Sequence, residues 1–302
     1  MKHTTEFKPI SLEDKIIFDE FLTQTPPETS ELTFTNLFMW RHRYKPRWTI
    51  HADCLVTLFL DSKNIWRSFQ PLGHGNVPNA LRFVTEYLYD NYGNAAISRV
   101  GPSFAQQYAS SQYHIEEDRN NSDYVYLTQE LIHLPGNKFH KKKNLFNQFV
   151  KKYEFEYKEF DSTLAPQLLE LQENWCELKQ CANDESLIDE DHAIYQALKF
   201  MDTLKFRGAA LIVQGRVAAF SFGEMLNPET AVIHIEKGDS SFTGIYAAMN
   251  KLFCENAWSN VTYINREQDL GIEGLRRAKL SYNPHHLVPK FTLSPEKEAL
   301  LN

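Results

Sequence analysis

Apolar residues follow two different periods along this chain, and stretches of the two kinds take turns. Runs such as Ala231 to Lys237 are rich in β-branched residues and place polar side chains two positions apart, which is typical of a strand. Other runs repeat apolar residues every three or four positions, as amphipathic helices do. A chain in which strands and helices alternate is predicted to form an α/β protein.

The first half is predicted to start with a helix, which Ser11 and Asp14 would open as a variant of the capping box. An aromatic-rich run, Leu32 to Tyr44, fits either a helix or a strand. The remaining pattern predicts strands at 48–51, 55–60 and 65–69, a helix opened by Pro78, a strand at 95–100, a short helix after Pro102, and strands at 113–116 and 123–127.

The second half is predicted to start with a helix at 144–152 and a strand at 154–160. Two helices (164–179 and 189–201) and two strands (209–213 and 217–225, joined by a hairpin turn at Gly215) come next. The stretch from Ala231 to Tyr282 then predicts strand, helix, strand and helix, and a closing strand follows at 286–293. We interpret this stretch as the organising element, because polar side chains gather at both of its strand ends.

The two halves therefore share one order: helices, a meander of strands, helix, strand, helix and a final strand. No residue-level repeat accompanies it. The shared order predicts two related units with mixed α/β sheets, residues 1–137 and residues 138–302. Only the second half has acids and bases at its strand ends, so we expect the active site there and a structural or substrate-shaping role for the first half.

Length and composition agree with two folded domains, because 302 residues with 13% aromatic side chains can fill two cores. The net charge of −7 opposes a protein-wide attraction to nucleic acid or anionic lipid, although a basic patch can act locally. No apolar run approaches the roughly 20 residues of a transmembrane helix. The run Met1 to Pro9 also lacks the apolar core of a signal peptide.

The cysteines and histidines indicate no metal site. The four cysteines show neither a CxxC pair nor a zinc spacing, and His285-His286 has no third ligand nearby. We therefore expect reduced thiols in a cytoplasmic protein. The cysteines are Cys54, Cys176, Cys181 and Cys254.

The first strand end offers candidate acid–base chemistry. In a regular strand, His234 and Glu236 would share one face and could act as base and orienter, with Lys237 beside them. A solvated polar face is the alternative. The loop from Gly238 to Gly244 precedes a helix and could present backbone N–H groups to a phosphate, although it has no Walker lysine.

The second strand end is denser in charge. Arg266 could hold a phosphate or carboxylate, with Glu267 or Asp269 activating an attacking group and Asn265 beside them. The alternative is a structural network of arginine and carboxylates. On the following helix, Arg276, Lys279 and Asn283 fall in one row and, with Tyr282, could line an anion pocket.

One basic run lies where the two halves join. It contains Lys141, Lys142 and Lys143, with Asn144 directly after them. Such a run in an acidic protein can contact a phosphate or an RNA backbone. A solvated basic face is the alternative.

Several short runs together resemble one bacterial family. They are FHKKKN from Phe139, HIEKGD from His234, INRE from Ile264, GLRRAK from Gly274 and SYNP from Ser281, and ELTFTNLFMWR from Glu31 also fits. The chain thus resembles, over nearly its whole length, an uncharacterised family that shares its domain with the C-terminal part of phosphatidylglycerol lysyltransferases. The resemblance implies two tandem domains of the N-acetyltransferase (GNAT) fold, akin to transferases that take amino acids from aminoacyl-tRNA.

The resemblance implies acyl transfer, with an aminoacyl group moving from a charged tRNA to an amine or hydroxyl acceptor. We expect Glu236 or Glu267 to accept a proton, and Arg266 and Lys279 to bind the donor's phosphate or the developing charge. Asp269 would hold a substrate ammonium, and Lys141 to Lys143 would contact tRNA. No tightly bound cofactor is expected, and the sequence names neither a lipid nor a small-molecule acceptor.

Two alternatives stay open. One keeps the fold but uses acetyl-CoA, or another acyl-CoA, as donor, with the loop from Gly238 to Gly244 on the pyrophosphate. The other is a non-catalytic module that binds a small anionic ligand or a partner protein.

Overall fold

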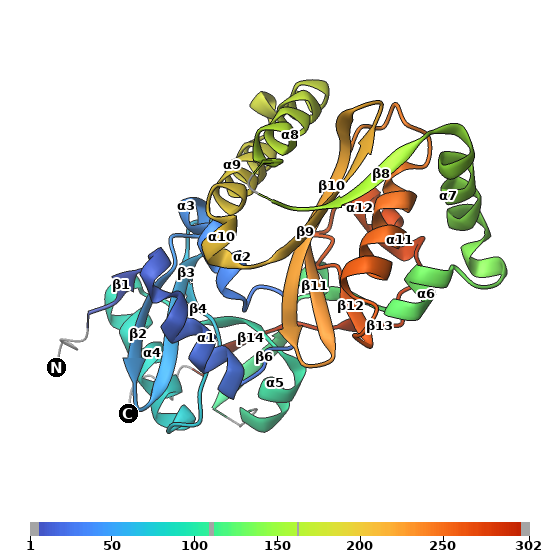
Figure 1. Ribbon diagram of the computed structural model, residues 1–302. Coiled ribbons are helices and arrows are strands. Elements are labelled where there is room, and N and C mark those ends of the chain that lie inside the picture. Colours follow the sequence, from blue (N-terminus) through green and yellow to red (C-terminus); the bar gives the residue numbers. More distant parts are fainter. Residues whose placement is uncertain (1–5, 109–111, 162, 297–302) are drawn as a thin grey trace. The chain divides into compact units, whose positions relative to one another are not determined.

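The computed structural model describes residues 6–108, 112–161 and 163–296. The first five residues of the polar run Met1 to Pro9 therefore lie outside the described part. The chain divides into two compact units, Met1–Asp123 with Val288–Asn302, and Tyr124–Leu287 (Figure 1). Each unit is described by itself.

The first unit is built on a seven-stranded sheet of order β1-β2-β3-β4-β5-β14-β6. The capping box predicted at Ser11 and Asp14 is present, and the ambiguous run Leu32 to Tyr44 forms two short helices. The strands are β1 (Lys8–Pro9), β2 (Arg47–His51), β3 (Cys54–Leu60), β4 (Trp66–Ser68), β5 (Ile97–Val100), β6 (Tyr113–Glu117) and β14 (Phe291–Pro295). The helices are η1 (Leu12–Asp14), α1 (Lys15–Gln24), α2 (Phe34–Met39), α3 (Arg41–Tyr44), α4 (Val77–Tyr92), α5 (Pro102–Tyr108) and η2 (Arg119–Asn121).

The second unit has its own seven-stranded sheet, of order β13-β7-β12-β11-β10-β9-β8. Helix α6 was not predicted from the sequence. The strands are β7 (Asp123–Leu127), β8 (Phe155–Glu159), β9 (Arg207–Val213), β10 (Arg216–Asn227), β11 (Thr230–Gly238), β12 (Tyr263–Asn265) and β13 (His286–Val288). The helices are α6 (Thr128–His133), η3 (Asn137–Phe139), α7 (His140–Lys152), α8 (Ala165–Lys179), η4 (Cys181–Asn183), α9 (Glu185–Lys199), α10 (Met201–Leu204), α11 (Ile245–Ala257) and α12 (Glu273–Leu280).

The two sheets have the same order, with one strand exchanged. In the first unit β14, from the end of the chain, lies between β5 and β6, and in the second unit β7, from the first half, lies between β12 and β13. The prediction of two related mixed α/β units is thereby confirmed. The division differs from the expected one at residues 137 and 138, because β7 pairs with β12 while β14 pairs with β5 and β6. The expected closing strand at 286–293 is accordingly two strands, β13 and β14, in different sheets.

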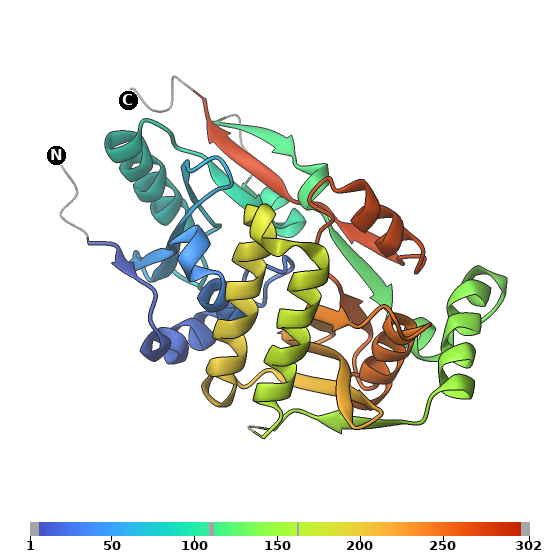
Figure 2. The ribbon, with the colours of Figure 1, turned by 90° about the horizontal axis from the view of Figure 1, so that it is seen from above.

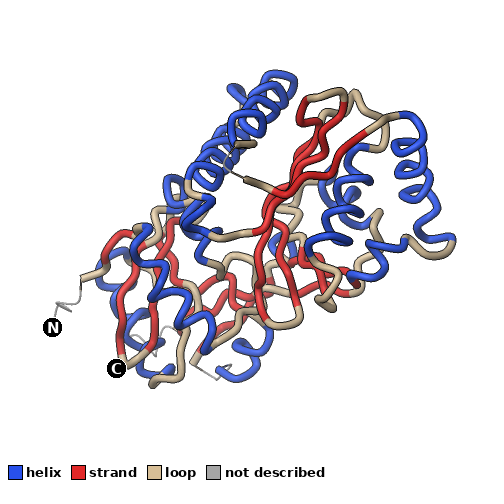
Figure 3. Tube along the Cα trace, viewed as in Figure 1, coloured by secondary structure: helices blue, strands red, loops and turns tan. Residues whose placement is uncertain are grey.

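Helices cover both faces of the second sheet. Helix α11 packs on β9, β10 and β11 together with α7, whereas α8 and α9 lie side by side on the opposite face (Figures 1 and 2). In Figure 3 the strands of this unit run between the two layers of helices. Residues of α11 such as Met249 and Phe253 fill the core with Ala231 and Ile233 of β11, which fixes β11 as a central strand.

Candidate functional site

The candidate site forms where two parallel strands part. Strands β11 and β12 pair from Thr230 and Tyr263 to Val232 and Asn265. Beyond that point the two chains follow different neighbours. The Arg266 N–H donates to the Tyr124 carbonyl over 2.9 Å, while β11 continues along β10 as far as Gly238. Side chains therefore fill the space between the diverging backbones.

A β-bulge at His234 changes which side chains share a face. Ile233 is paired with Gly223 and Ile235 with Phe222, so His234 is an extra residue in β11. Glu236 consequently points toward α11, where its carboxylate lies 3.5 Å from the Asn250 amide nitrogen. The expectation that His234 and Glu236 share one face was wrong, because it assumed a regular strand.

His234 is a buried cation rather than a base. Its side chain is fully buried, with Nδ1 2.8 Å from Glu267 and Nε2 3.0 Å from Glu224. Burial alone would lower the pKa of His234, but the hydrogen bonds and charges of Glu224 and Glu267 raise it from 6.5 to about 9. At neutral pH the imidazolium links β10 and β11 to Glu267, the second residue after β12. Glu224 was not singled out from the sequence.

Glu236 and Arg266 form an ion pair across the divergence. An Arg266 Nη donates to Glu236 over 3.0 Å, and both side chains are largely buried. Burial alone would lower the pKa of Arg266, but the charge of Glu236 raises it. The guanidinium also lies 5.0 Å from the ring centre of Tyr282 and 6.0 Å from that of Tyr126.

Lys142 reaches the same place from α7. Its ammonium lies 3.9 Å from the ring centre of Tyr282, and Glu236 and Arg266 are the charges that act on it. Burial and the repulsion of Arg266 lower the pKa of Lys142 from 10.5 to about 8, against the attraction of Glu236. The neighbouring Lys141, Lys143 and Asn144 are exposed, and the Asn144 amide contacts His140 over 3.0 Å. The structure therefore separates Lys142 from the other lysines of its run.

The loop after β12 is held in place by hydrogen bonds to Asp269. Asp269 is fully buried and accepts hydrogen bonds from Tyr124 at 2.6 Å, from Arg276 at 2.8 Å and from the Gly271 N–H at 2.8 Å. Burial alone would raise the pKa of Asp269, yet the hydrogen bonds from Arg276 and Tyr124 lower it. The carboxylate that we expected to hold a substrate ammonium thus holds the loop.

Lys279 and Asn265 also serve this loop. The Lys279 ammonium donates to the carbonyls of Arg266 and Glu267, and Asn265 accepts from the Glu267 N–H over 2.8 Å. Glu267 has a positive φ of 57°, which asparagine turns of this kind support. Lys279 therefore contacts backbone oxygens at the place where we expected it to bind a donor phosphate.

Lys237 points to the opposite face of the sheet. It forms an ion pair of 2.5 Å with Glu190 of α9 and lies 3.5 Å from the ring centre of Trp175 in α8. Burial is the largest cause that lowers the pKa of Lys237. Glu190 was not singled out from the sequence, so this partner was missed.

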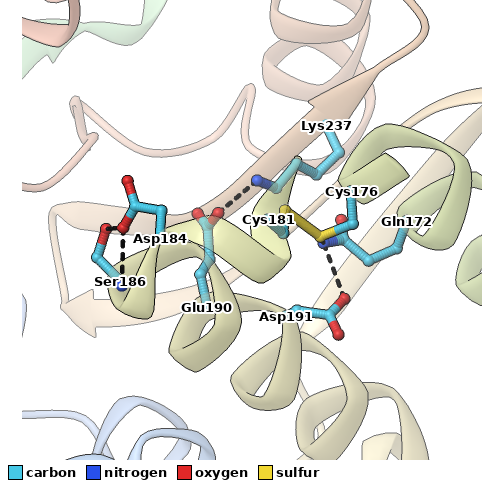
Figure 4. The surroundings of a disulfide bond; sticks show 8 residues. All are labelled: Gln172, Cys176, Cys181, Asp184, Ser186, Glu190, Asp191 and Lys237. Carbon is cyan, nitrogen blue, oxygen red and sulfur yellow. Dashed lines mark hydrogen bonds and ion pairs between the residues drawn. A yellow bond between two sulfur atoms is a disulfide. The ribbon is translucent and has the colours of Figure 1, made fainter. Parts of the chain in front are cut away.

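A disulfide joins α8 to the turn before α9. Cys176 and Cys181 are bonded, with their Cα atoms 5.0 Å apart (Figure 4). The prediction of four reduced thiols was wrong for this pair, because Gln180 adopts a left-handed conformation (φ 54°) and turns the chain back on itself. Cys54 and Cys254 are free and buried.

The loop from Gly238 to Gly244 has little N–H capacity left for a phosphate. The N–H groups of Ser241 and Phe242 donate to Asp239, that of Thr243 to the Tyr153 hydroxyl, and that of Ile245 to Phe242. A Cβ on Gly244 (φ 87°) would overlap the Leu145 carbonyl of α7. The glycine thus serves the packing of α7 on α11.

The two mixed sheets fit a tandem GNAT-like fold. FemX has this fold, at a TM-score of 0.54 and 9% identity over 98% of each chain. The chain matches the family described as "Phosphatidylglycerol lysyltransferase, C-terminal" over residues 23–294, and it belongs to that family. The resemblance seen in the sequence is confirmed. Family and fold together place the chain among acyltransferases in the broad sense.

Individual proteins are also similar to this chain in sequence or structure. A conserved protein of unknown function from Bacteroides thetaiotaomicron is 33% identical, with a TM-score of 0.90 over 96% of this chain and 99% of its own. The structure of L-PGS from Bacillus licheniformis has a TM-score of 0.68 at 12% identity, over 97% and 95%. An uncharacterised protein of Mycoplasmoides gallisepticum is 24% identical over 187 residues, and the chain spans only 60% of that relative's length.

Within residues 6–108, 112–161 and 163–296, each helix is too short or too polar to cross a membrane. The same ranges contain no group of three or more His, Cys, Asp and Glu side chains arranged to hold a metal ion.

Proposed function

We propose that the second unit transfers an aminoacyl group from aminoacyl-tRNA to an amine or hydroxyl acceptor, with the reaction taking place beside Glu236, Arg266 and Lys142. The observation that carries this proposal is the balance of charge at the strand divergence. Two cations, Arg266 and Lys142, lie over the ring of Tyr282, and one carboxylate, Glu236, lies among them. Such a site attracts a group that is anionic or becomes anionic.

The chemistry follows from the charges. An ester on tRNA is already activated, so the protein needs to position the acceptor, remove its proton and stabilise the carbonyl oxygen as charge develops. We favour Glu236 as the proton acceptor, because it lies with Arg266 and Lys142 beside the ring of Tyr282, whereas Glu267 lies against the His234 imidazolium. Arg266 orients Glu236 and, with Lys142, offsets the charge of the oxyanion or of a donor phosphate.

The exposed lysines of α7 would contact the tRNA backbone. Lys141 and Lys143 lie on the same helix as Lys142 and are exposed, so they can reach a polyanion outside the site. The acetyl-CoA alternative has less support. It needs free N–H groups in the loop from Gly238 to Gly244, and those of this loop already donate to Asp239, Phe242 and Tyr153.

The test follows a labelled amino acid. Purified protein is incubated with tRNA carrying radiolabelled amino acids, and with either vesicles that contain phosphatidylglycerol or a mixture of small amines. Phosphatidylglycerol and tRNA charged with lysine are included because the family description names a phosphatidylglycerol lysyltransferase. We expect label to leave the tRNA and to appear on one acceptor class, and Glu236→Gln to slow transfer by about 10²- to 10⁴-fold while tRNA binding persists.

Binding to charged tRNA, uncharged tRNA and acetyl-CoA at one salt concentration provides the comparison between donors. Selective binding of charged tRNA supports the proposal. Saturable binding of acetyl-CoA alone would replace it with acetyl transfer, and label that stays on every tRNA in all mixtures would refute it.

A further inference from the structure

The ammonium of Lys142 differs from those of the other cations at the site. Arg266 has its carboxylate partner, and Lys279 has two carbonyls. For Lys142 the described residues provide the ring of Tyr282 but neither a hydrogen bond nor an ion pair. An N–H donor that is partly buried and faces a reaction centre without an acceptor can give its hydrogen to a bound group.

We propose that Lys142 is the general acid of the transfer reaction, which protonates the ribose oxygen as it leaves the aminoacyl group. This inference rests on the proposed function and assigns to Lys142 a role distinct from that of its exposed neighbours. The α7 backbone holds the residue in place, since Phe139 and Phe149 of the same segment are fully buried.

The atoms balance over one turnover. The acceptor's nitrogen or oxygen attacks the ester carbonyl carbon, a new bond to that carbon forms, and the bond from the carbon to the ribose oxygen breaks. The acceptor's proton passes to the Glu236 carboxylate, and the ribose oxygen takes a proton from Lys142. The proton on Glu236 then returns to the neutral Lys142 amine through solvent, which restores both groups.

The surroundings suit an acid that works near neutral pH. Glu236 of β11, Arg266 after β12 and Tyr282 after α12 face the ammonium. From α11, Lys251 is paired with Glu255 at 2.9 Å and lies over the ring of Phe146 in α7. With a pKa lowered to about 8, the Lys142 ammonium is charged at pH 7 and gives up its proton far more readily than an ordinary lysine.

The leaving group provides the decisive experiment. Single-turnover rates are measured with wild-type protein, Lys142→Met and Lys142→Arg on two donors, an aminoacyl ester of tRNA and an analogue in which the ester is a thioester. A thiolate leaves without a proton. We expect Lys142→Met to slow the ester reaction by about 10²-fold or more, and the thioester reaction by less than about 5-fold.

The arginine variant separates an acid from a charge. Arginine keeps the positive charge but does not release a proton in this pH range, so Lys142→Arg should remain slow on the ester. The wild-type ester rate should also fall above about pH 8, and this fall should be absent from the thioester reaction. Lys141→Met serves as the matched control. It should weaken tRNA binding and leave the ratio of the transfer rates from the ester and thioester donors unchanged.

Three results would overturn the assignment. Equal slowing of both donors by Lys142→Met would indicate a binding or structural role, and recovery of the ester rate in Lys142→Arg would indicate a purely electrostatic one. Both leave the proposed function intact. Wild-type protein that transfers from neither donor would refute the proposed function itself, and this inference with it.

Discussion

The buried imidazolium of His234 makes the stability of the second unit depend on pH in a direction that can be stated in advance. The pKa of His234 is raised from 6.5 to about 9 in the folded protein. A group whose pKa is raised by folding stabilises the protein fully below its unfolded pKa, and that contribution is lost as the pH rises through the folded pKa. The window is therefore pH 6.5 to 9.

The size of the effect follows from the shift. At about 1.4 kcal/mol for each pKa unit, a shift from 6.5 to about 9 corresponds to about 3 kcal/mol of unfolding free energy. His234→Gln keeps a polar side chain but cannot carry a charge. It leaves Glu224 and Glu267 facing each other's charge, so we expect it to be less stable than wild type at pH 6.5 by about 3 to 5 kcal/mol.

The assay is urea denaturation of both proteins at several pH values from 6 to 9.5. The wild-type free energy of unfolding should decline across this window more steeply than that of His234→Gln, and the two curves should converge toward pH 9.5. A direct NMR titration of His234 gives an independent measurement of its pKa. Parallel curves, or an imidazole that titrates near 6.5, would refute the reasoning about the carboxylate pair.

Three further perturbations test other parts of the second unit. Gly244→Ala should lower the free energy of unfolding by more than about 2 kcal/mol, because the added Cβ sits on a left-handed backbone and overlaps a carbonyl of α7. Urea denaturation measures this loss, with Gly274→Ala, whose added Cβ meets open space, as the control. Under denaturing conditions the unreduced protein should show two reactive thiols and the reduced protein four. Loss of the short disulfide loop should cost about 2 kcal/mol and speed amide exchange in α8 and η4, whereas unchanged exchange would remove its structural role. Replacing Lys141 and Lys143 with Gln should reduce the slope of log binding constant against log salt for tRNA by about 2, and an unchanged slope would rule out their contact with the backbone.

Local periodicity was enough to predict most of the elements and their order. The run from Ala231 to Tyr282 forms β11, α11, β12 and α12 as expected, because each element there has its own spacing of apolar residues and its own breakers. The partner of a strand is a different matter. Residues 123–127 and 286–293 were each predicted as one strand, and nothing local indicates that 123–127 and the end of the second run insert into the sheet of the other half.

The sequence indicated most of the residues that lie at the candidate site, but few of the contacts that they make. Glu236, Arg266 and Tyr282 do come together, and Lys142 joins them from a run that had been assigned to tRNA as a whole. The bulge at His234 could not be predicted from the sequence. An extra residue in β11 changes which side chains share a face, and it is recognised only from the pairing of β11 with β10. Asn250 was missed as well, since it lies in a helix most of whose residues belong to the core. Its amide oxygen is buried without a hydrogen-bond partner among the described residues.

The divergence of β11 and β12 explains why so many charged side chains gather here and why only some are available for chemistry. Where two parallel strands part, backbone groups beyond the last pair lose their usual partners, and a buried carbonyl without a partner is costly. Side chains replace the missing strand. Lys279 donates to the carbonyls of Arg266 and Glu267, and the Tyr246 hydroxyl donates to that of Gly238 over 2.9 Å.

Those side chains donate their hydrogen bonds to backbone carbonyls. Lys279→Met should therefore destabilise the second unit and affect transfer only through folding. Glu236 and Lys142 differ, because neither is needed to satisfy a backbone group among the described contacts. Lys142→Met should accordingly lower activity with little change in the free energy of unfolding. Glu236→Gln should also lower activity, but it leaves the largely buried Arg266 guanidinium without its carboxylate and should destabilise the unit as well. A Lys279→Met protein that unfolds like wild type yet fails in transfer would reverse this division of roles.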